Sequence, residues 1–324
     1  MSHVAFVFPG QGSQQSGMGK EIYQNFKQAR LVFEEASEAI GVDLKKLCFE
    51  GSDSDLQLTH NTQPAIVVTS IAIGRVLKQE LGISPNFGAG HSVGEYAAAI
   101  MAQVLSLVDG VRAVRLRGEA MQKATPVGTG AMAAVLGLSD SQAEELCRFV
   151  NHLGNNQFPI WCANFNAPGQ VVLSGYSEGI KRLHDVNPEQ IWPGQNVKFK
   201  IIPLAVSAPF HCPLMKPAET IMRDFLTSIT FERPLFPILQ NVNPKPEKDP
   251  AVIRENLIAQ VASPVQWSKT MEEFPQLGVQ TIIEVGHGRV LQGLFKKAHH
   301  TFKIYGSSTL KELQDLEKSL RKED

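Results

Sequence analysis

The chain has 324 residues, of which 43% are hydrophobic and 19% are charged, and its formal net charge is −1 at pH 7. This length and composition exclude a disordered chain and indicate one large domain, or a large domain that carries a smaller one. The near-neutral charge predicts no nucleic-acid partner, and no stretch approaches the ~20 apolar residues that cross a bilayer, so we expect a cytoplasmic protein without a membrane partner.

The amino-terminal part combines a short strand with several helices. Residues 4–8 form an apolar run that stops at Pro9-Gly10, which predicts a buried strand followed by a loop. The segment that ends at Ala89 has poor strand propensity, because Pro85, Asn86 and Gly88 interrupt it. The spacing of apolar residues predicts helices at 17–40, 63–77, 95–104 and 107–123.

The pattern changes near residue 128, where strands begin to dominate. We expect strands at 131–136, 160–165, 170–174 and 197–204, helices at 139–149 and 179–186, and a turn at 166–169. This βαββαβ order is typical of ferredoxin-like domains, so we place a small inserted domain at residues 129–205.

The remainder of the chain returns to the large domain, which therefore consists of residues 1–128 and 206–324. A strand is expected at 281–285, and helices are expected at 253–262, 290–297 and 309–320. Thr309 and Glu312 have the spacing of a capping box at the start of the last helix.

Gly90-His91-Ser92-Val93-Gly94 fits the pattern G-x-S-x-G of a nucleophile elbow. In such an elbow a serine lies on a strained turn between a strand and a helix, where backbone N–H groups can stabilise an oxyanion. Three fixed residues also recur by chance. These residues alone leave a catalytic serine and a simple loop-to-helix turn about equally supported.

A nucleophilic serine needs a base, and two of the nine histidines lie in loops that could reach a cleft. His211 follows the last strand expected in the small domain, and His287 follows the strand expected at 281–285. Their spacing alone does not distinguish them. His91 adjoins Ser92, and its side chain is expected to point into the surroundings of the elbow rather than at the hydroxyl.

Two further positions stand out. Gln11 lies between Gly10 and Gly12 in the first loop, where the backbone can approach a ligand closely or simply turn. Arg117 lies on a helix with two other arginines, and solvation at the surface is the ordinary explanation for such a residue. The four cysteines form no C-x-x-C pair, which predicts reduced thiols and no metal site.

Taken together, these segments resemble the malonyl-CoA:acyl carrier protein transacylases of fatty acid synthesis and the discrete acyltransferases that serve polyketide synthases. The motifs that carry the resemblance appear in the expected order from about residue 4 to 294: FPGQGSQ at 8–14, TQPAI at 62–66, GHSVGE at 90–95, RGEAMQ at 117–122, GTGAMAAV at 128–135, NAPGQVVLSG at 166–175, SAPFHCPLM at 207–215 and PVQW at 264–267.

The resemblance implies an α/β fold, with an α/β-hydrolase-like large domain around a parallel sheet and the ferredoxin-like insertion. It also implies roles for individual residues. Ser92 would be the nucleophile, His211 its base, and the backbone N–H groups of Gln11 and Val93 the oxyanion donors. Arg117 would hold the malonate carboxylate, and backbone carbonyls near Gln260 would orient His211, so that no triad aspartate is needed.

Other implied roles concern the shape of the cleft. Gln63 and Asn166 match positions that line or brace it, and a bracing role is favoured for both. Phe210 matches a bulky residue that crowds an α-methyl branch. The chain departs from the family at Val93, where leucine is usual, and at His287, where proline is common. We also expect an extra loop at 187–195.

The resemblance implies malonyl-CoA and an acyl carrier protein as partners, a monomer, and no cofactor, since the coenzyme A thioester is a substrate. Basic residues near the carboxyl terminus form a candidate docking patch for an acidic carrier, although a solvated basic face is the more ordinary explanation; they are Arg289, Lys296, Lys297 and Lys303. Two rival functions remain, an acyl hydrolase that clears stalled groups and a non-catalytic scaffold. Arg117 argues against the first, because a neutral acyl group would leave it unpaired.

Overall fold

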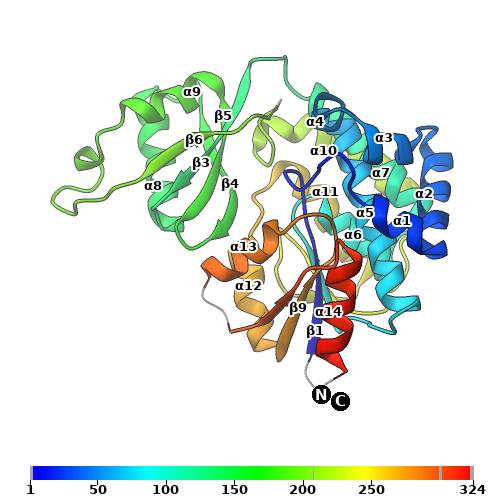
Figure 1. Ribbon diagram of the computed structural model, residues 1–324. Coiled ribbons are helices and arrows are strands. Elements are labelled where there is room, and N and C mark those ends of the chain that lie inside the picture. The colour runs from blue at the N-terminus through cyan, green and yellow to red at the C-terminus, as the bar shows by residue number, and fades with distance from the viewer. Residues whose placement is uncertain (1–2, 207, 299–300, 322–324) are drawn as a thin grey trace.

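The computed structural model describes residues 3–206, 208–298 and 301–321, and in them the chain forms two units. The larger unit is built on a six-stranded sheet and the smaller on a four-stranded antiparallel sheet, which projects to one side of it (Figure 1). Both described termini lie at the same end of the larger unit. The chain is therefore a mixed α/β protein with one largely parallel and one antiparallel sheet.

The larger sheet has the strand order β10-β9-β1-β2-β7-β8. All neighbours are parallel except β8, which runs antiparallel to β7. Residues 5–8 of β1 are fully buried because both faces of the sheet are covered. The strands are β1 (His3–Phe8), β2 (Phe87–Gly90), β7 (Ile238–Leu239), β8 (Pro246–Glu247), β9 (Val279–Glu284) and β10 (Lys303–Tyr305).

The register of β1 and β2 determines where two of the sequence motifs meet. Phe8 pairs with Gly90, and each is the last residue of its strand. Because the two strands are parallel, the loops that follow them leave from the same edge of the sheet. The loop that carries Gln11 therefore lies beside the turn that carries Ser92.

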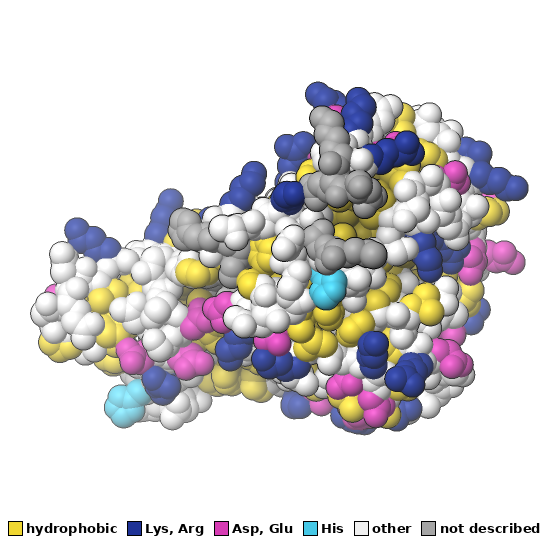
Figure 2. Space-filling model, turned by 90° about the horizontal axis from the view of Figure 1, so that it is seen from below, with side chains coloured by type: hydrophobic (Ala, Val, Ile, Leu, Met, Phe, Trp, Pro, Cys, Tyr) yellow, Lys and Arg dark blue, Asp and Glu magenta, His cyan; other side chains and the backbone are white. Residues whose placement is uncertain are grey.

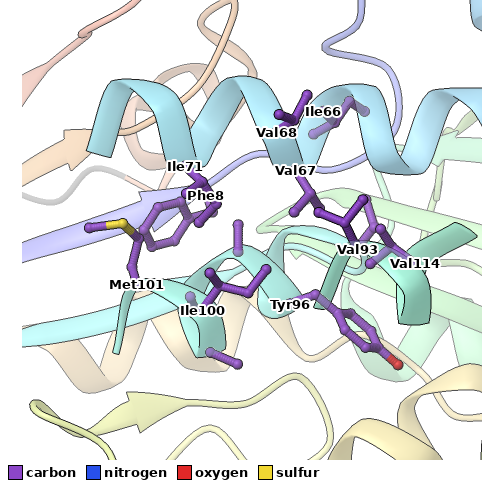
Figure 3. Packing of buried hydrophobic residues seen from close by; sticks show 14 of the residues in the cluster. Phe8, Ile66, Val67, Val68, Ile71, Val93, Tyr96, Ile100, Met101 and Val114 are labelled. Atoms are coloured by element: carbon purple, nitrogen blue, oxygen red, sulfur yellow. The ribbon is translucent and has the colours of Figure 1, made fainter. Parts of the chain in front are cut away.

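Helices cover the larger sheet on both faces, and α5 (Thr59–Gln79) is buried along most of its length. It packs against α6 (Gly94–Met101), and Figure 3 shows residues of both helices interdigitating with Phe8 of β1. The other helices of this unit are α1 (Lys20–Asn25), α2 (Lys27–Ile40), α3 (Leu44–Glu50), α4 (Asp53–Gln57), α7 (Leu107–Lys123), α10 (Lys216–Ser228), α11 (Pro250–Ala259), α12 (Trp267–Gln276), α13 (Val290–Lys297) and α14 (Leu310–Leu320).

The smaller unit has the strand order β4-β5-β3-β6 and its own hydrophobic core. Its elements are β3 (Gly130–Leu136), α8 (Asp140–Leu153), β4 (Ile160–Ala167), β5 (Gln170–Tyr176), α9 (Ser177–Arg182) and β6 (Lys200–Pro203). They lie within the range 129–205 that the sequence predicts for an insertion. One parallel bridge joins the two units, in which the Phe165 N–H donates to the Val265 carbonyl at 2.9 Å.

Several elements differ from the sequence-based expectation. The weak segment before the elbow is a strand, β2, because it pairs with β1 on one side and β7 on the other, and this tertiary pairing overrides its propensity. The expected turn at 166–169 is shorter, since Ala167 still pairs with Gln170 and leaves a two-residue turn. The expected strand at 197–204 is reduced to β6, because its one partner strand, β3, ends at Leu136.

Two helical expectations also need correction. The helix expected at 17–40 is interrupted at Phe26, whose backbone is extended, so that α1 and α2 are separate. At the last helix, α14, one of the two reciprocal hydrogen bonds of the expected capping box forms and the other does not. Thr309 accepts from the Glu312 N–H, whereas the Glu312 carboxylate accepts from Ser308 rather than from the Thr309 N–H.

The surface at the end where the termini lie carries positive and negative side chains interspersed (Figure 2), as the net charge of −1 suggests. Among the described residues, no helix is both long and apolar enough to span a bilayer. The four cysteines are buried free thiols, and the Cys147 and Cys162 sulfurs lie 3.9 Å apart.

Candidate active site

Ser92 lies on a sharp turn between β2 and α6. Its φ of 51° is in the left-handed region, which non-glycine residues rarely occupy and which is often found at functional sites. Glycine is required on either side. A Cβ at Gly90 would lie 2.0 Å from the Gly94 carbonyl carbon, and one at Gly94 would lie 2.2 Å from the Phe8 oxygen. The structure therefore has the strand–turn–helix geometry of a nucleophile elbow.

His211 is the histidine that the fold brings to Ser92. Its Nε2 lies 2.7 Å from the Ser92 Oγ, and its Nδ1 lies 2.9 Å from the Gln260 carbonyl oxygen. A carbonyl can only accept, so Nδ1 carries the proton and Nε2 is free to accept one from Ser92. His287 is elsewhere, with its Nε2 3.2 Å from the Gln15 Oε1. The structure thus distinguishes two histidines that sequence spacing leaves tied.

The surroundings of His211 keep it neutral. Burial, followed by the positive charge of Arg117, lowers its pKa to about 3. An imidazole with so low a pKa is unprotonated at neutral pH, which is the form that a general base needs.

Arg117 is buried, with 1% of its surface exposed, so the surface-solvation explanation is wrong for this residue. Its Nη1 donates to the Gln63 Oε1 at 2.8 Å, and its Nη2 donates to the Gln260 Oε1 at 2.9 Å and to the Ser92 Oγ at 3.2 Å. Within the described ranges its Nε has no hydrogen-bond partner, and no carboxylate lies within 4.0 Å of the guanidinium. A cation held by neutral amides beside a serine is placed to receive an anionic ligand.

A burial penalty accompanies this arrangement. Burial lowers the pKa of Arg117, while the nearby Tyr96 and Glu95 act in the opposite direction. The guanidinium also lies over the Tyr96 ring, 5.8 Å from its centroid. These contacts compensate in part for the missing solvent and hold the side chain in place.

Backbone donors adjoin the serine. In the part of the chain that the structure describes, the N–H groups of Gln11 and Val93 have no hydrogen-bond acceptor, and both residues line the cavity at Ser92. The Val93 side chain packs in the core near Val67 of α5 and Val114 of α7 (Figure 3). A branched apolar residue therefore fits the core at this position.

The cavity has a volume of about 420 Å³ and lies between the two units. Pockets that bind small molecules in proteins commonly fall between roughly 300 and 1,000 Å³. Ser92, His211 and Arg117 form its polar floor, and Phe210 lines it beside them. Apolar residues from the smaller unit and from α13 complete the walls, among them Met132, Val172 and Leu294. The cavity combines one charged anchor with a largely apolar wall.

His91, Asn166 and Gln260 brace this arrangement. The His91 Nε2 lies 2.8 Å from the Asn166 Oδ1, which links the elbow to the smaller unit, and the imidazole does not contact the Ser92 hydroxyl. The Gln260 Nε2 donates to the Ser92 carbonyl at 3.0 Å while its Oε1 accepts from Arg117. Gln260 thus contacts Ser92, Arg117 and His211 together.

Sequence reasoning missed two buried residues behind Ser92. The Asn241 side chain accepts from the Ser92 N–H at 2.7 Å, and Glu95 accepts from the Asn241 N–H at 2.7 Å. Glu95 could have been noticed, because it is a carboxylate in an otherwise apolar helix. Asn241 had no such signal, since it lies 149 residues from its partner in the sequence.

The basic residues near the carboxyl terminus are in part engaged in contacts. The Arg289 Nη2 lies 2.8 Å from the Glu312 Oε1, and the Lys297 Nζ donates to the Gln170 Oε1 at 2.5 Å. Lys296 lies on the last turn of α13, and Lys303 lies in β10. Since Leu291 and Leu294 of α13 line the cavity, this basic segment adjoins its wall. No cluster of three or more potential metal ligands occurs among the described residues.

The sequence matches a family model described as an acyl transferase domain over residues 5–315. It is 40% identical, over 100% of this chain and 99% of the relative, to the malonyl CoA-acyl carrier protein transacylase of Bacillus subtilis (strain 168). It is 42% identical to the protein of that name from Escherichia coli (strain K12), over 92% of this chain and 93% of the relative.

Solved structures of similar proteins superimpose on this chain over almost its whole length. FabD from Acinetobacter baumannii superimposes with a TM-score of 0.92 at 39% identity, covering 100% of this chain and 99% of that one. A malonyl-transacylase solved in complex with its type II polyketide synthase acyl carrier protein superimposes with a TM-score of 0.91 at 38% identity, covering 98% of this chain and 100% of that one.

Proposed function

The chain belongs to the acyl transferase domain family, and from this membership we propose that it transfers a malonyl group from malonyl-CoA to the phosphopantetheine thiol of an acyl carrier protein. The observation that carries this proposal is the Arg117 guanidinium, which is buried, has no carboxylate partner within 4.0 Å in the described ranges, and lies 3.2 Å from the Ser92 Oγ. A dicarboxylic acyl group would present its free carboxylate to this cation while its thioester carbonyl lies at the serine.

In the first half-reaction, the His211 Nε2 takes the proton of the Ser92 hydroxyl as the oxygen attacks the malonyl thioester carbonyl. The N–H groups of Gln11 and Val93 stabilise the tetrahedral oxyanion, and the loss of one such donor typically costs on the order of 10²–10³ in rate. The carbon–sulfur bond then breaks, and the coenzyme A sulfur leaves with the proton that His211 returns. The product is a malonyl ester on Ser92.

In the second half-reaction, the pantetheine thiol of the carrier protein gives its proton to His211 and its sulfur attacks the ester. The carbon–oxygen bond breaks, and Ser92 recovers its proton from His211. The acyl donor and the acyl acceptor use the cavity in turn, which gives ping-pong kinetics. No metal or cofactor takes part in this scheme.

The proposal also covers the folds of the two domains, the cellular compartment, the oligomeric state and the surface that receives the carrier protein. The order β4-β5-β3-β6 supports a ferredoxin-like insertion, and the parallel sheet with an elbow after β2 supports an α/β-hydrolase-like larger domain. Buried free thiols fit the reducing cytoplasm. We propose a monomer, with Lys296 and its basic neighbours beside the cavity wall as the surface that receives an acidic carrier.

The direct test is to incubate the protein with malonyl-CoA and a holo acyl carrier protein and to follow the mass of the carrier. Gain of one malonyl group by the carrier, dependent on Ser92 and on the pantetheine thiol, is the expected result. Release of free malonate at the same rate with or without carrier would point to the rival hydrolase. Neither reaction with any acyl thioester would leave only a scaffold.

A further inference from the structure

Two backbone groups of the strained elbow are held by a single side chain from a distant element. The Asn241 Oδ1 accepts from the Ser92 N–H at 2.7 Å, and the Asn241 Nδ2 donates to the Gly90 carbonyl at 2.6 Å. Asn241 is fully buried and follows β7, the strand that pairs with β2. Without the Asn241 amide, the Ser92 N–H and the Gly90 carbonyl would lose their hydrogen-bond partner inside the protein, where unpaired polar groups are costly.

The direction of these bonds matters for the chemistry. Because the Ser92 N–H is committed to Asn241, it points away from the cavity, and the next N–H, that of Val93, is the one that faces it. The left-handed φ of 51° at Ser92 produces this reversal between two successive peptide groups. The Asn241 side chain and its two hydrogen bonds to the elbow form a clamp. This clamp stabilises the conformation of Ser92 that exposes both its hydroxyl and the Val93 N–H to the cavity.

A buried carboxylate holds the clamp in turn. Glu95 is fully buried in the first turn of α6, and its two oxygens accept from the Asn241 N–H at 2.7 Å and from the Gln240 Nε2 at 2.9 Å. Gln240 also donates to the Ile253 carbonyl at 3.1 Å. The elbow is thereby tied through one carboxylate to the segment after β7 and to α11. None of these three side chains lines the cavity.

We propose that Asn241, supported by Glu95, is a positioning residue for acyl transfer, which holds the Ser92 peptide so that the hydroxyl meets His211 and the Val93 N–H meets the oxyanion. This inference rests on the proposed role of Ser92 as nucleophile. It adds an amide–carboxylate pair that acts on the backbone of the elbow and touches no substrate.

The experiment measures single-turnover acylation of Ser92 by malonyl-CoA over a range of concentrations. For Asn241→Ala we expect the maximal acylation rate to fall by about 10- to 100-fold, because misplacement by about 1 Å can cost on the order of 10²-fold. The malonyl-CoA concentration at half-maximal rate should stay unchanged, since Arg117 and the cavity wall are intact. Asn243→Ala is the matched control, being an exposed asparagine two residues away.

A second variant keeps the test decisive where Asn241→Ala fails to fold. Asn241→Asp has the same shape and can accept from the Ser92 N–H, but it can donate to the Gly90 carbonyl only when protonated. Its acylation rate should therefore be low at pH 8 and recover toward the wild-type rate as the pH falls. The titratable group that contacts residue 241 is Glu95 of α6, whose pKa burial raises to about 7 while the Arg117 charge acts in the opposite direction. The same scan on wild type and Asn243→Asp accounts for its titration.

The outcomes separate the two proposals. Failure of the wild type to acylate Ser92 would overturn the proposed function itself. A wild type that acylates normally, together with a folded Asn241→Ala or Asn241→Asp variant that acylates at the wild-type rate at every pH, would overturn the positioning role alone. A fall in maximal rate accompanied by weaker malonyl-CoA binding would also contradict it, because the clamp would then act on the substrate pocket.

Discussion

The guanidinium of Arg117 donates to the hydroxyl of Ser92 across 3.2 Å, so the residue proposed to bind the acyl carboxylate and the residue proposed to carry the acyl group are direct neighbours. Gln63 and Gln260 hold the guanidinium from the sides with neutral oxygens. This leaves its charge uncompensated at short range until an anionic acyl group arrives. We expect this relationship to favour a malonyl group over neutral acyl groups.

Removal of this charge should abolish the selectivity. In Arg117→Ala we expect kcat/KM for malonyl-CoA to fall on the order of 10²-fold or more, because charge-assisted hydrogen bonds are worth about 1.5–3 kcal/mol each. Transfer from acetyl-CoA should be retained or increased. Steady-state kinetics with both thioesters checks this, with the exposed Arg112→Ala on the same helix as control. Unchanged malonyl selectivity would remove Arg117 from the mechanism.

A competing carboxylate beside Arg117 should have a similar but milder effect. Gln63→Glu would pair with the guanidinium at the position where the amide oxygen now accepts at 2.8 Å. We expect about a tenfold rise in KM for malonyl-CoA, with little change in kinetics for acetyl-CoA, because the substrate would have to displace an internal ion pair. Gln63→Leu, which adds no charge, is the comparison. Equal effects of both variants on malonyl- and acetyl-CoA would argue for a purely structural role of Gln63.

The pH dependence of acylation should report the environment of His211. Burial and the Arg117 charge lower the His211 pKa to about 3, so the base stays neutral, and active, well below pH 6.5. Loss of the positive charge in Arg117→Ala should raise this pKa and move the acid limb of acylation upward. Arg117→Lys should leave it in place. The measurement uses acetyl-CoA over pH 4–8, where the wild type and Arg117→Lys should keep a flat profile and Arg117→Ala should lose rate toward pH 4. Flat profiles for all three proteins would contradict the coupling.

The Phe210 side chain should limit the size of the acyl group that the cavity accepts. Its side chain lines the cavity directly beside His211. In Phe210→Ala we expect the ratio of kcat/KM for methylmalonyl-CoA to that for malonyl-CoA to rise about 10-fold or more, since one methyl group in an apolar pocket is worth roughly 1–3 kcal/mol. Competition between the two thioesters measures the ratio directly. A ratio that does not change would assign the limit on branching to another part of the wall.

Much of the fold could be predicted from local pattern alone. The ends of α7 and α13 fall where apolar spacing predicts them, because amphipathic helices carry a clear period. The ends of the strands were harder to predict from the local sequence. β6 is short because its partner strand ends. β2 forms in spite of its glycines and of the proline that precedes it, because it is paired on both sides. Neither fact is contained in the local sequence.

The candidate site could likewise be predicted only in part from the sequence. The G-x-S-x-G pattern indicated Ser92, since the turn requires its glycines. Sequence spacing could not choose between His211 and His287, because the choice depends on which loop folds over the cleft. Asn241 was missed altogether, since an asparagine in a loop has no periodic or motif signal until the strand pairing of β7 and β2 brings it to the elbow.

Ser92 is proposed to carry the malonyl group during transfer. The intact mass of the protein, measured after brief incubation with malonyl-CoA and again after addition of holo acyl carrier protein, tests this most directly. We expect one malonyl adduct on the wild type, none on Ser92→Ala, and discharge of the adduct when the carrier is added. An adduct that persists in Ser92→Ala, or a carrier that becomes malonylated while no adduct forms on the wild type, would contradict the account.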